Sequence, residues 1–197
     1  MNCLGVILAG GGATRYGGRP KGLAVVDGVR IIDRVAASLR DAADDLLLVS
    51  NDPDAASWLP GVRTARDLRT GEGALGGLHA AISHAGGDGT LVVAWDMPFV
   101  PPALLRALRA LGEAGVDAAV AASETSGRGV EPLCAWYGPN CLAAIERRLD
   151  AGDRRVVAFF DDVQVARLGV ADVAQWGDPK RIFWNVNSPD DLSSAPR

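Results

Sequence analysis

The hydrophobic residues of this chain fall into short uninterrupted runs, separated by stretches whose apolar positions repeat at helical spacing. Cys3 to Leu8 and Leu46 to Val49 are apolar runs without alternation, and Ile31 to Ala43 carries its apolar side chains along one helical stripe. Strands without alternation are typical of a parallel sheet that is covered on both faces. The order strand, helix, strand therefore predicts an α/β fold.

The same alternation continues to the C-terminus. Further strands are expected at residues 62–65, 90–94, 118–122, 132–137, 163–170 and 183–187. Helices are expected after a glycine-rich loop at 71–77, after Pro101-Pro102, at 142–149, at 156–160 and from Ser188 onwards, with a surface loop at 123–130. We therefore expect residues 1–197 to form a single Rossmann-like domain, with a mostly parallel central sheet and helices on both faces.

Composition and charge narrow the class of protein. The chain has 197 residues, of which 48% are hydrophobic, and a formal net charge of −4, which argues against binding to nucleic acid or to anionic membranes. No apolar stretch approaches the roughly 20 residues that a membrane-spanning helix needs. Its three cysteines, an odd number, fit buried thiols better than a disulfide framework. We expect a cytoplasmic protein.

The first candidate for a functional site is the stretch from Leu8 to Gly22, LAGGGATRYGGRPKG. It follows the first predicted strand, is rich in glycine, and contains three basic side chains and no acidic one. Glycines allow the backbone to approach a ligand closely, and successive exposed N–H groups form a concavity that suits anions. The stretch predicts a phosphate-binding loop; the alternative is a flexible loop with solvated charges.

Two common phosphate loops are excluded by their spacing. A P-loop requires Ser or Thr after its lysine, whereas Lys21 is followed by Gly22. A dinucleotide-binding fingerprint requires G-x-G-x-x-G, and the sixth position counted from Gly10 is Arg15. This loop therefore belongs to another class of nucleotide site.

Five short segments together resemble one family of nucleotidyltransferases, the molybdenum cofactor guanylyltransferase (MobA) family. They match its L-A-G-G-x-[SA]-x-R-[MY]-G loop with a following lysine, its G-P-L-A-G segment, its D-x-P, its A-G-[ED]-R-[RK]-[VM] and its N-x-N-[ST]-P. In this chain they are residues 8–21, 73–77, 96–98, 151–156 and 185–189. Tyr16, Ala13 and Ala74 depart from the usual residues, which affects the loop shape more than the chemistry.

This resemblance implies a nucleotide-diphospho-sugar transferase-like fold and an enzyme that transfers GMP from GTP to the terminal phosphate of molybdopterin, with Mg²⁺ as cofactor. Molybdenum-insertion proteins and molybdoenzyme chaperones are the implied protein partners. The residues leave other possibilities open. A molybdopterin cytidylyltransferase or another small nucleotidyltransferase would use the same loops, although Gly10-Gly11 favours guanine over cytosine. A nucleotide-binding adaptor without catalysis would share the loops as well.

The triphosphate and metal are assigned to three side chains. Lys21 and Arg15 would neutralise the triphosphate, and Lys21 is the first choice for the essential charge. Asp96 follows a buried strand, where carboxylates face the ligand crevice of an open α/β sheet, and one aspartate with phosphate oxygens suffices for Mg²⁺. The alternative for Asp96 is a turn-forming residue before Met97-Pro98.

The remaining assignments follow from the resemblance. Leu8, Ala9, Gly10 and Gly11 would contact the nucleotide through their backbone. Asn51 and Asp67, each after a predicted strand, would bind guanine, although either could simply end its strand. The acceptor would be bound by Arg154, Arg155 and Asn187. Asn187 also resembles the second metal-side position, and both arginines could instead be solvated.

Overall fold

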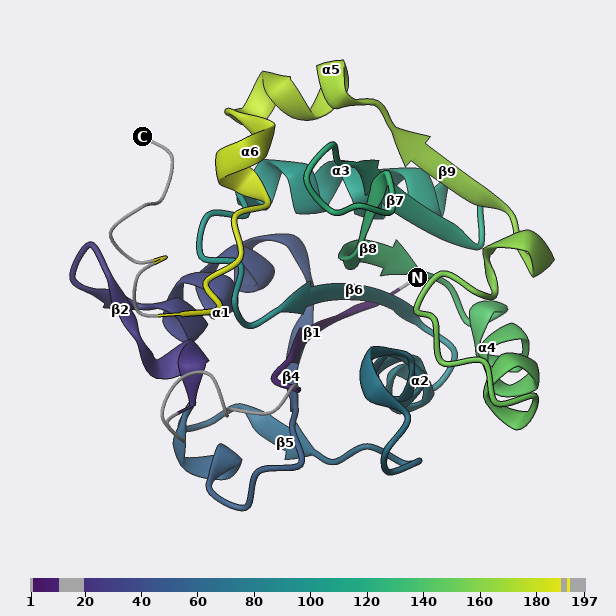
Figure 1. The fold of residues 1–197 in the computed structure, drawn as a ribbon, viewed down its shortest axis with the longest axis horizontal. Helices are drawn as coiled ribbons and strands as arrows, with labels where there is room; N and C mark the ends of the chain where they lie inside the picture. The colour runs from purple at the N-terminus through teal and green to yellow at the C-terminus, as the bar shows by residue number, and fades with distance from the viewer. Residues whose placement is uncertain (1, 11–19, 189–190, 192–197) are drawn as a thin grey trace.

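The computed structural model describes residues 2–10, 20–188 and 191, and a seven-stranded sheet runs through it in the order β5-β4-β1-β6-β8-β7-β9 (Figure 1). In chain order its strands are β1 Cys3–Leu8, β4 Asp45–Val49, β5 Arg63–Ala65, β6 Gly89–Ala94, β7 Ala118–Ala122, β8 Val130–Tyr137 and β9 Val165–Leu168. β1 pairs in parallel with β4 and β6, β4 with β5, and β7 with β9. β8 is antiparallel to both of its neighbours. The predicted α/β class and the mostly parallel sheet are confirmed.

Four helices cover the two faces of the sheet. They are α1 Ile31–Ala42, α2 Gly73–Ala85, α3 Pro102–Glu113 and α4 Cys141–Asp150. The core on one face contains side chains of α1 and α3, and the core on the other face contains those of α2 and α4. Alternate residues of β1 enter the two cores: Cys3 and Ile7 the first, Val6 and Leu8 the second. This double coverage explains why the strands are apolar throughout.

Short elements complete the chain. They are the hairpin of β2 Val25–Val26 and β3 Val29–Arg30, the helices α5 Val170–Val173 and α6 Pro179–Ile182, and 3₁₀ turns at Lys21–Leu23, Ala55–Ser57, Phe160–Asp162 and Ala174–Trp176. The turn signal Asp27-Gly28 forms the hairpin, with positive φ angles of 49° and 79° as a type I′ turn requires. No helix among the described residues is long and apolar enough to cross a membrane.

Two of the predicted elements are wrong. Residues 156–160 do not form a helix, because their backbone bonds span only three residues, from Ala158 to Arg155 and from Phe160 to Val157. The segment is too short to repay the cost of helix nucleation. Residues 183–187 do not join the sheet. Phe183 and Val186 are buried, but the segment crosses the end of β6, where the Val186 N–H donates to the Asp96 carbonyl at 2.9 Å.

The second glycine-rich segment also differs from the expectation. α2 begins at Gly73, so residues 73–77 form its first turns and not a loop. This end of the helix lies against β1, and a Cβ on Gly77 would be 3.6 Å from Leu8, an ordinary contact distance. The helix expected from Ser188 lies largely outside the described residues.

Gly112→Ala tests the packing of α3 against β8. Alanine in a helix is favoured over glycine by up to about 1 kcal/mol. A Cβ on Gly112, however, would overlap the buried indole of Trp136, and overpacking of this kind costs about 1–3 kcal/mol. We expect a net loss in the free energy of unfolding, measured by urea titration. In a Trp136→Leu background the same change should cost less; stabilisation by Gly112→Ala in the wild-type background would contradict this packing.

Candidate active site

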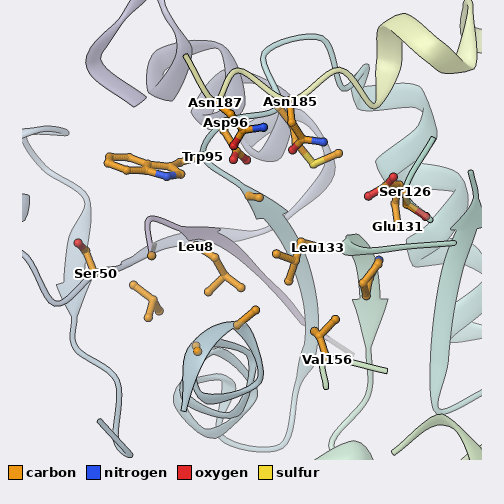
Figure 2. A pocket seen from close by; sticks show the side chains of 18 of the residues that line it. Leu8, Ser50, Trp95, Asp96, Ser126, Glu131, Leu133, Val156, Asn185 and Asn187 are labelled. Atoms are coloured by element: carbon orange, nitrogen blue, oxygen red, sulfur yellow. The ribbon is translucent and has the colours of Figure 1, made fainter. Parts of the chain in front are cut away.

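The parallel strands β1, β4, β5 and β6 end at one edge of the sheet, and a cavity of about 490 Å³ opens there. Ligands of open α/β sheets bind in such a crevice, outside the carboxyl ends of the strands. The polar side chains of the cavity form three groups: one after β4 and β5, one after β6, and one around the start of β8. Figure 2 labels residues of the second and third groups.

The central group joins three segments that are far apart in the sequence. The Lys21 ammonium forms an ion pair with the Asp96 carboxylate and donates to Asn187 Oδ1 at 3.3 Å. The side chains of Lys21 and Asp96 are only 17% and 12% exposed, so water screens their interaction weakly. The structure therefore brings together three residues that were predicted to belong to the site.

Packing beside the central group determines where Lys21 lies. Gly22 lies directly against the indole of Trp95, where any side chain would overlap the ring. Trp95 in turn stacks on Trp58, with ring centroids 5.2 Å apart. Because glycine allows this close approach, the turn that carries Lys21 lies beside the residue that precedes Asp96.

The central group has the chemistry of a divalent-cation site. Asp96 Oδ1 is buried and has no hydrogen-bond partner among the described residues, and Asn187 adds an amide oxygen nearby. Mg²⁺ prefers oxygen ligands and is typically held by one or two carboxylates with substrate phosphates and water. The described part of the chain contains no cluster of three or more His, Cys, Asp or Glu suited to a metal. A cation here would thus depend on phosphate oxygens for part of its coordination.

Asn51 and Asp67 form the group at the β4–β5 end. The Asn51 amide donates to Asp67 Oδ2 at 2.7 Å, and the Asp67 N–H donates to Asn51 Oδ1 at 2.9 Å. This reciprocal pair leaves Asp67 Oδ1 at the cavity wall, 3.7 Å from the position of a Cβ on Gly77. The two predicted base-binding residues are therefore adjacent and hold each other in place.

The backbone of the first loop is described only in part. Leu8 and Gly10 line the cavity, whereas Ala9 is buried beneath it and accepts a hydrogen bond from Ser50 at 3.1 Å. Gly11 and Arg15 lie outside the described residues. Their predicted contacts with the nucleotide remain predictions.

The predicted acceptor-binding arginines are not part of the cavity lining. Arg154 donates to Glu72 at 2.6 Å and Arg155 pairs with Asp153 at 2.6 Å. Their side chains are 62% and 76% exposed. Their role in acceptor binding remains a prediction, and it requires that they leave these partners or bind a part of the acceptor outside the cavity.

The third group contains a candidate site residue that was not predicted from the sequence. Glu131 on β8 is only 7% exposed and lines the cavity with Thr125, Ser126 and Arg128, from the segment expected to be a surface loop. Burial raises the pKa of the Glu131 carboxyl, while a hydrogen bond from Ser123 and the charge of Arg128 oppose the rise. The signal in the sequence was an acidic residue within an otherwise apolar strand.

Comparisons with known proteins agree with this site. Residues 5–166 match the MobA-like NTP transferase domain family. The chain is 36% identical to a probable molybdenum cofactor guanylyltransferase of Pelotomaculum thermopropionicum over 99% of this chain and 92% of that protein. It is 33% identical to the molybdenum cofactor guanylyltransferase of Desulfosudis oleivorans over 97% of this chain and 93% of that one.

A solved structure of similar sequence has the same fold. Molybdopterin-guanine dinucleotide biosynthesis protein A of Archaeoglobus fulgidus superposes with a TM-score of 0.79 at 29% identity, over 98% of this chain and 96% of that one. The sheet order, the cavity at the carboxyl edge and the two full-length relatives lead to one conclusion: the chain belongs to the MobA-like NTP transferase family.

Proposed function

We propose that this protein transfers GMP from GTP to the terminal phosphate of molybdopterin and releases pyrophosphate, and that residues 1–197 act as one nucleotidyltransferase domain. The observation that carries the proposal is the central group of Lys21, Asp96 and Asn187, which lies between two polar ends of one cavity. This is the arrangement that two phosphate-bearing substrates need if they are to meet. Membership of the family supports the same reaction.

The reaction requires alignment and charge neutralisation more than proton transfer. The second pKa of a phosphate monoester is about 6, so the acceptor phosphate is largely dianionic at pH 7 and needs no strong base. Its oxygen attacks the α-phosphorus of GTP, and the bond from that phosphorus to the bridging oxygen of pyrophosphate breaks. Lys21 lies where negative charge accumulates, and Arg15 is proposed to assist it. A preorganised cation in such a position contributes about 3 kcal/mol or more.

Mg²⁺ is the proposed cofactor, and its chemistry here is to neutralise charge on the triphosphate. Asp96 would hold it through the buried Oδ1 atom that has no partner among the described residues, with Asn187 as an additional oxygen ligand. Lys21 keeps the other carboxylate oxygen of Asp96 in place. In this proposal Asp96 binds the metal through one oxygen and orients Lys21 toward the phosphates through the other.

We place the guanine at Asn51 and Asp67. Guanine presents an N1–H and a 2-amino group side by side, and a carboxylate can accept from both. The Asn51 amide already orients the Asp67 carboxylate. The backbone from Leu8 to Gly11 would then run along the phosphates.

The acceptor is placed toward β8, with Arg154, Arg155 and Asn187 as candidate contacts.

We locate the reaction in the cytoplasm, in agreement with the free and buried thiols of Cys3, Cys134 and Cys141. Molybdenum-insertion proteins and molybdoenzyme chaperones are the proposed protein partners.

The direct test is pyrophosphate release by the purified protein with Mg²⁺, molybdopterin and each of GTP, CTP, ATP and UTP. We expect release with GTP and only background with the others. A preference for CTP would make the protein a cytidylyltransferase. Binding of GTP without release of pyrophosphate would make it an adaptor.

Asp96→Asn tests the central group. Because the amide carries no negative charge, we expect kcat to fall by about 100-fold or more. The gain in GTP affinity that Mg²⁺ gives the wild-type protein should also disappear, measured by isothermal titration calorimetry with and without the metal. Asp161→Asn, at an exposed aspartate outside the cavity, is the matched control. Unchanged turnover in Asp96→Asn would remove Asp96 from the metal site.

Asp67→Asn tests the guanine assignment. Inosine triphosphate lacks the 2-amino group, so the wild-type protein should prefer GTP to it by about tenfold or more. Because an amide cannot accept both N–H groups, the variant should lose this preference mainly through a higher KM for GTP. The readout is kcat/KM for the two nucleotides. A variant that keeps the wild-type preference would place the base elsewhere.

A further inference from the structure

Glu131 is a buried acid for which the proposed reaction has no use. Asp96 and Glu131 are the two acidic residues in the buried core of the described chain, at 9% and 7% exposure, and both line the same cavity. Each has one carboxylate oxygen that is buried without a hydrogen-bond partner among the described residues. An unsatisfied buried acceptor costs free energy that a ligand can recover. The proposed metal accounts for Asp96 Oδ1, whereas Glu131 Oε1 still lacks a partner among the described residues.

The surroundings of Glu131 favour a flat polar ring. Leu133 and Val156 provide apolar surface on the same side of the cavity (Figure 2). Ser123 donates to the carboxylate, and Arg128 contributes a positive charge, but neither satisfies the buried Oε1 atom. An apolar wall beside one free acceptor suits a heterocycle that packs on its face and donates from its edge.

The position of Glu131 indicates which substrate would bind there. In Figure 2 it lies on the opposite side of Asp96 from Ser50, which precedes Asn51 and the proposed guanine end. The phosphates must pass Asp96 and Lys21 at the centre. A group that binds at Glu131 is therefore joined to the far side of the phosphates, which is the acceptor side.

We propose that Glu131 determines acceptor specificity by accepting two hydrogen bonds from a 2-amino-4-oxopyrimidine ring, one from its ring N–H and one from its 2-amino group. This inference rests on the proposed function, because a pterin acceptor contains that ring. Guanine presents the same pair of donors. The cavity thus holds one carboxylate for each heterocycle: Asp67 for the nucleotide and Glu131 for the acceptor.

Glu131→Gln tests this assignment with two simple ligands, pterin and lumazine, which has a carbonyl oxygen in place of the 2-amino group. Both are titrated into the full-length protein by calorimetry at saturating GTP and Mg²⁺, so that the nucleotide end is filled. We expect the wild-type protein to prefer pterin by about tenfold or more, because hydrogen bonds to a charged group are strong. The variant should bind the two ligands about equally. Glu124→Gln, in the adjoining loop, is the matched control and should keep the preference.

Turnover provides the second measurement. Glu131→Gln should raise the KM for molybdopterin about 10- to 100-fold while the affinity for GTP stays as in the wild type. A wild-type protein that does not distinguish pterin from lumazine, or a variant with the wild-type KM for molybdopterin, would overturn the assignment. Weaker GTP binding in the variant would overturn it too, because Glu131 would then belong to the nucleotide end. If instead the wild-type protein releases no pyrophosphate from GTP and molybdopterin, the proposed function itself fails.

Discussion

The ion pair between Lys21 and Asp96 is the interaction on which the cavity depends. It joins the last residues of the first glycine-rich stretch to the end of β6, and Lys21 also donates a hydrogen bond to Asn187. The neighbouring backbone bond from Val186 to Asp96 holds the C-terminal segment there. Removing Lys21 would leave a buried carboxylate without its cation, which is costly in a protein interior. The charge that neutralises Asp96 in the free protein is the one proposed to meet the triphosphate.

The central group lies between two ends of the cavity that carry different residues. Asn51 and Asp67 follow β4 and β5, on one side of β1 and β6, whereas Glu131 is on β8, on the other side. The antiparallel strand β8 is what brings a residue from the start of a strand to this edge of the sheet. In the proposed reaction, two similar heterocycles would then be distinguished by the end at which each binds.

Much of this architecture follows from local sequence patterns. The apolar runs predicted β1, β4 and β6. Because Asp96 directly follows the last of these runs, it was predicted to lie at the ligand edge of the sheet. Residues 183–187 were misassigned because the burial of Phe183 and Val186 arises where the segment crosses the end of β6, a tertiary contact that a local sequence pattern does not report. Glu131 was missed because its significance depends on the cavity, and the pairing of β8 between β6 and β7 is not visible in the chain order.

The most direct test of the two-ended cavity is a crystal structure of the protein with GTP and Mg²⁺. We expect guanine at Asn51 and Asp67, the metal on Asp96, the Lys21 ammonium on the triphosphate, and the surface at Glu131 free of nucleotide. Guanine bound against Glu131, or phosphates bound away from Lys21 and Asp96, would contradict it.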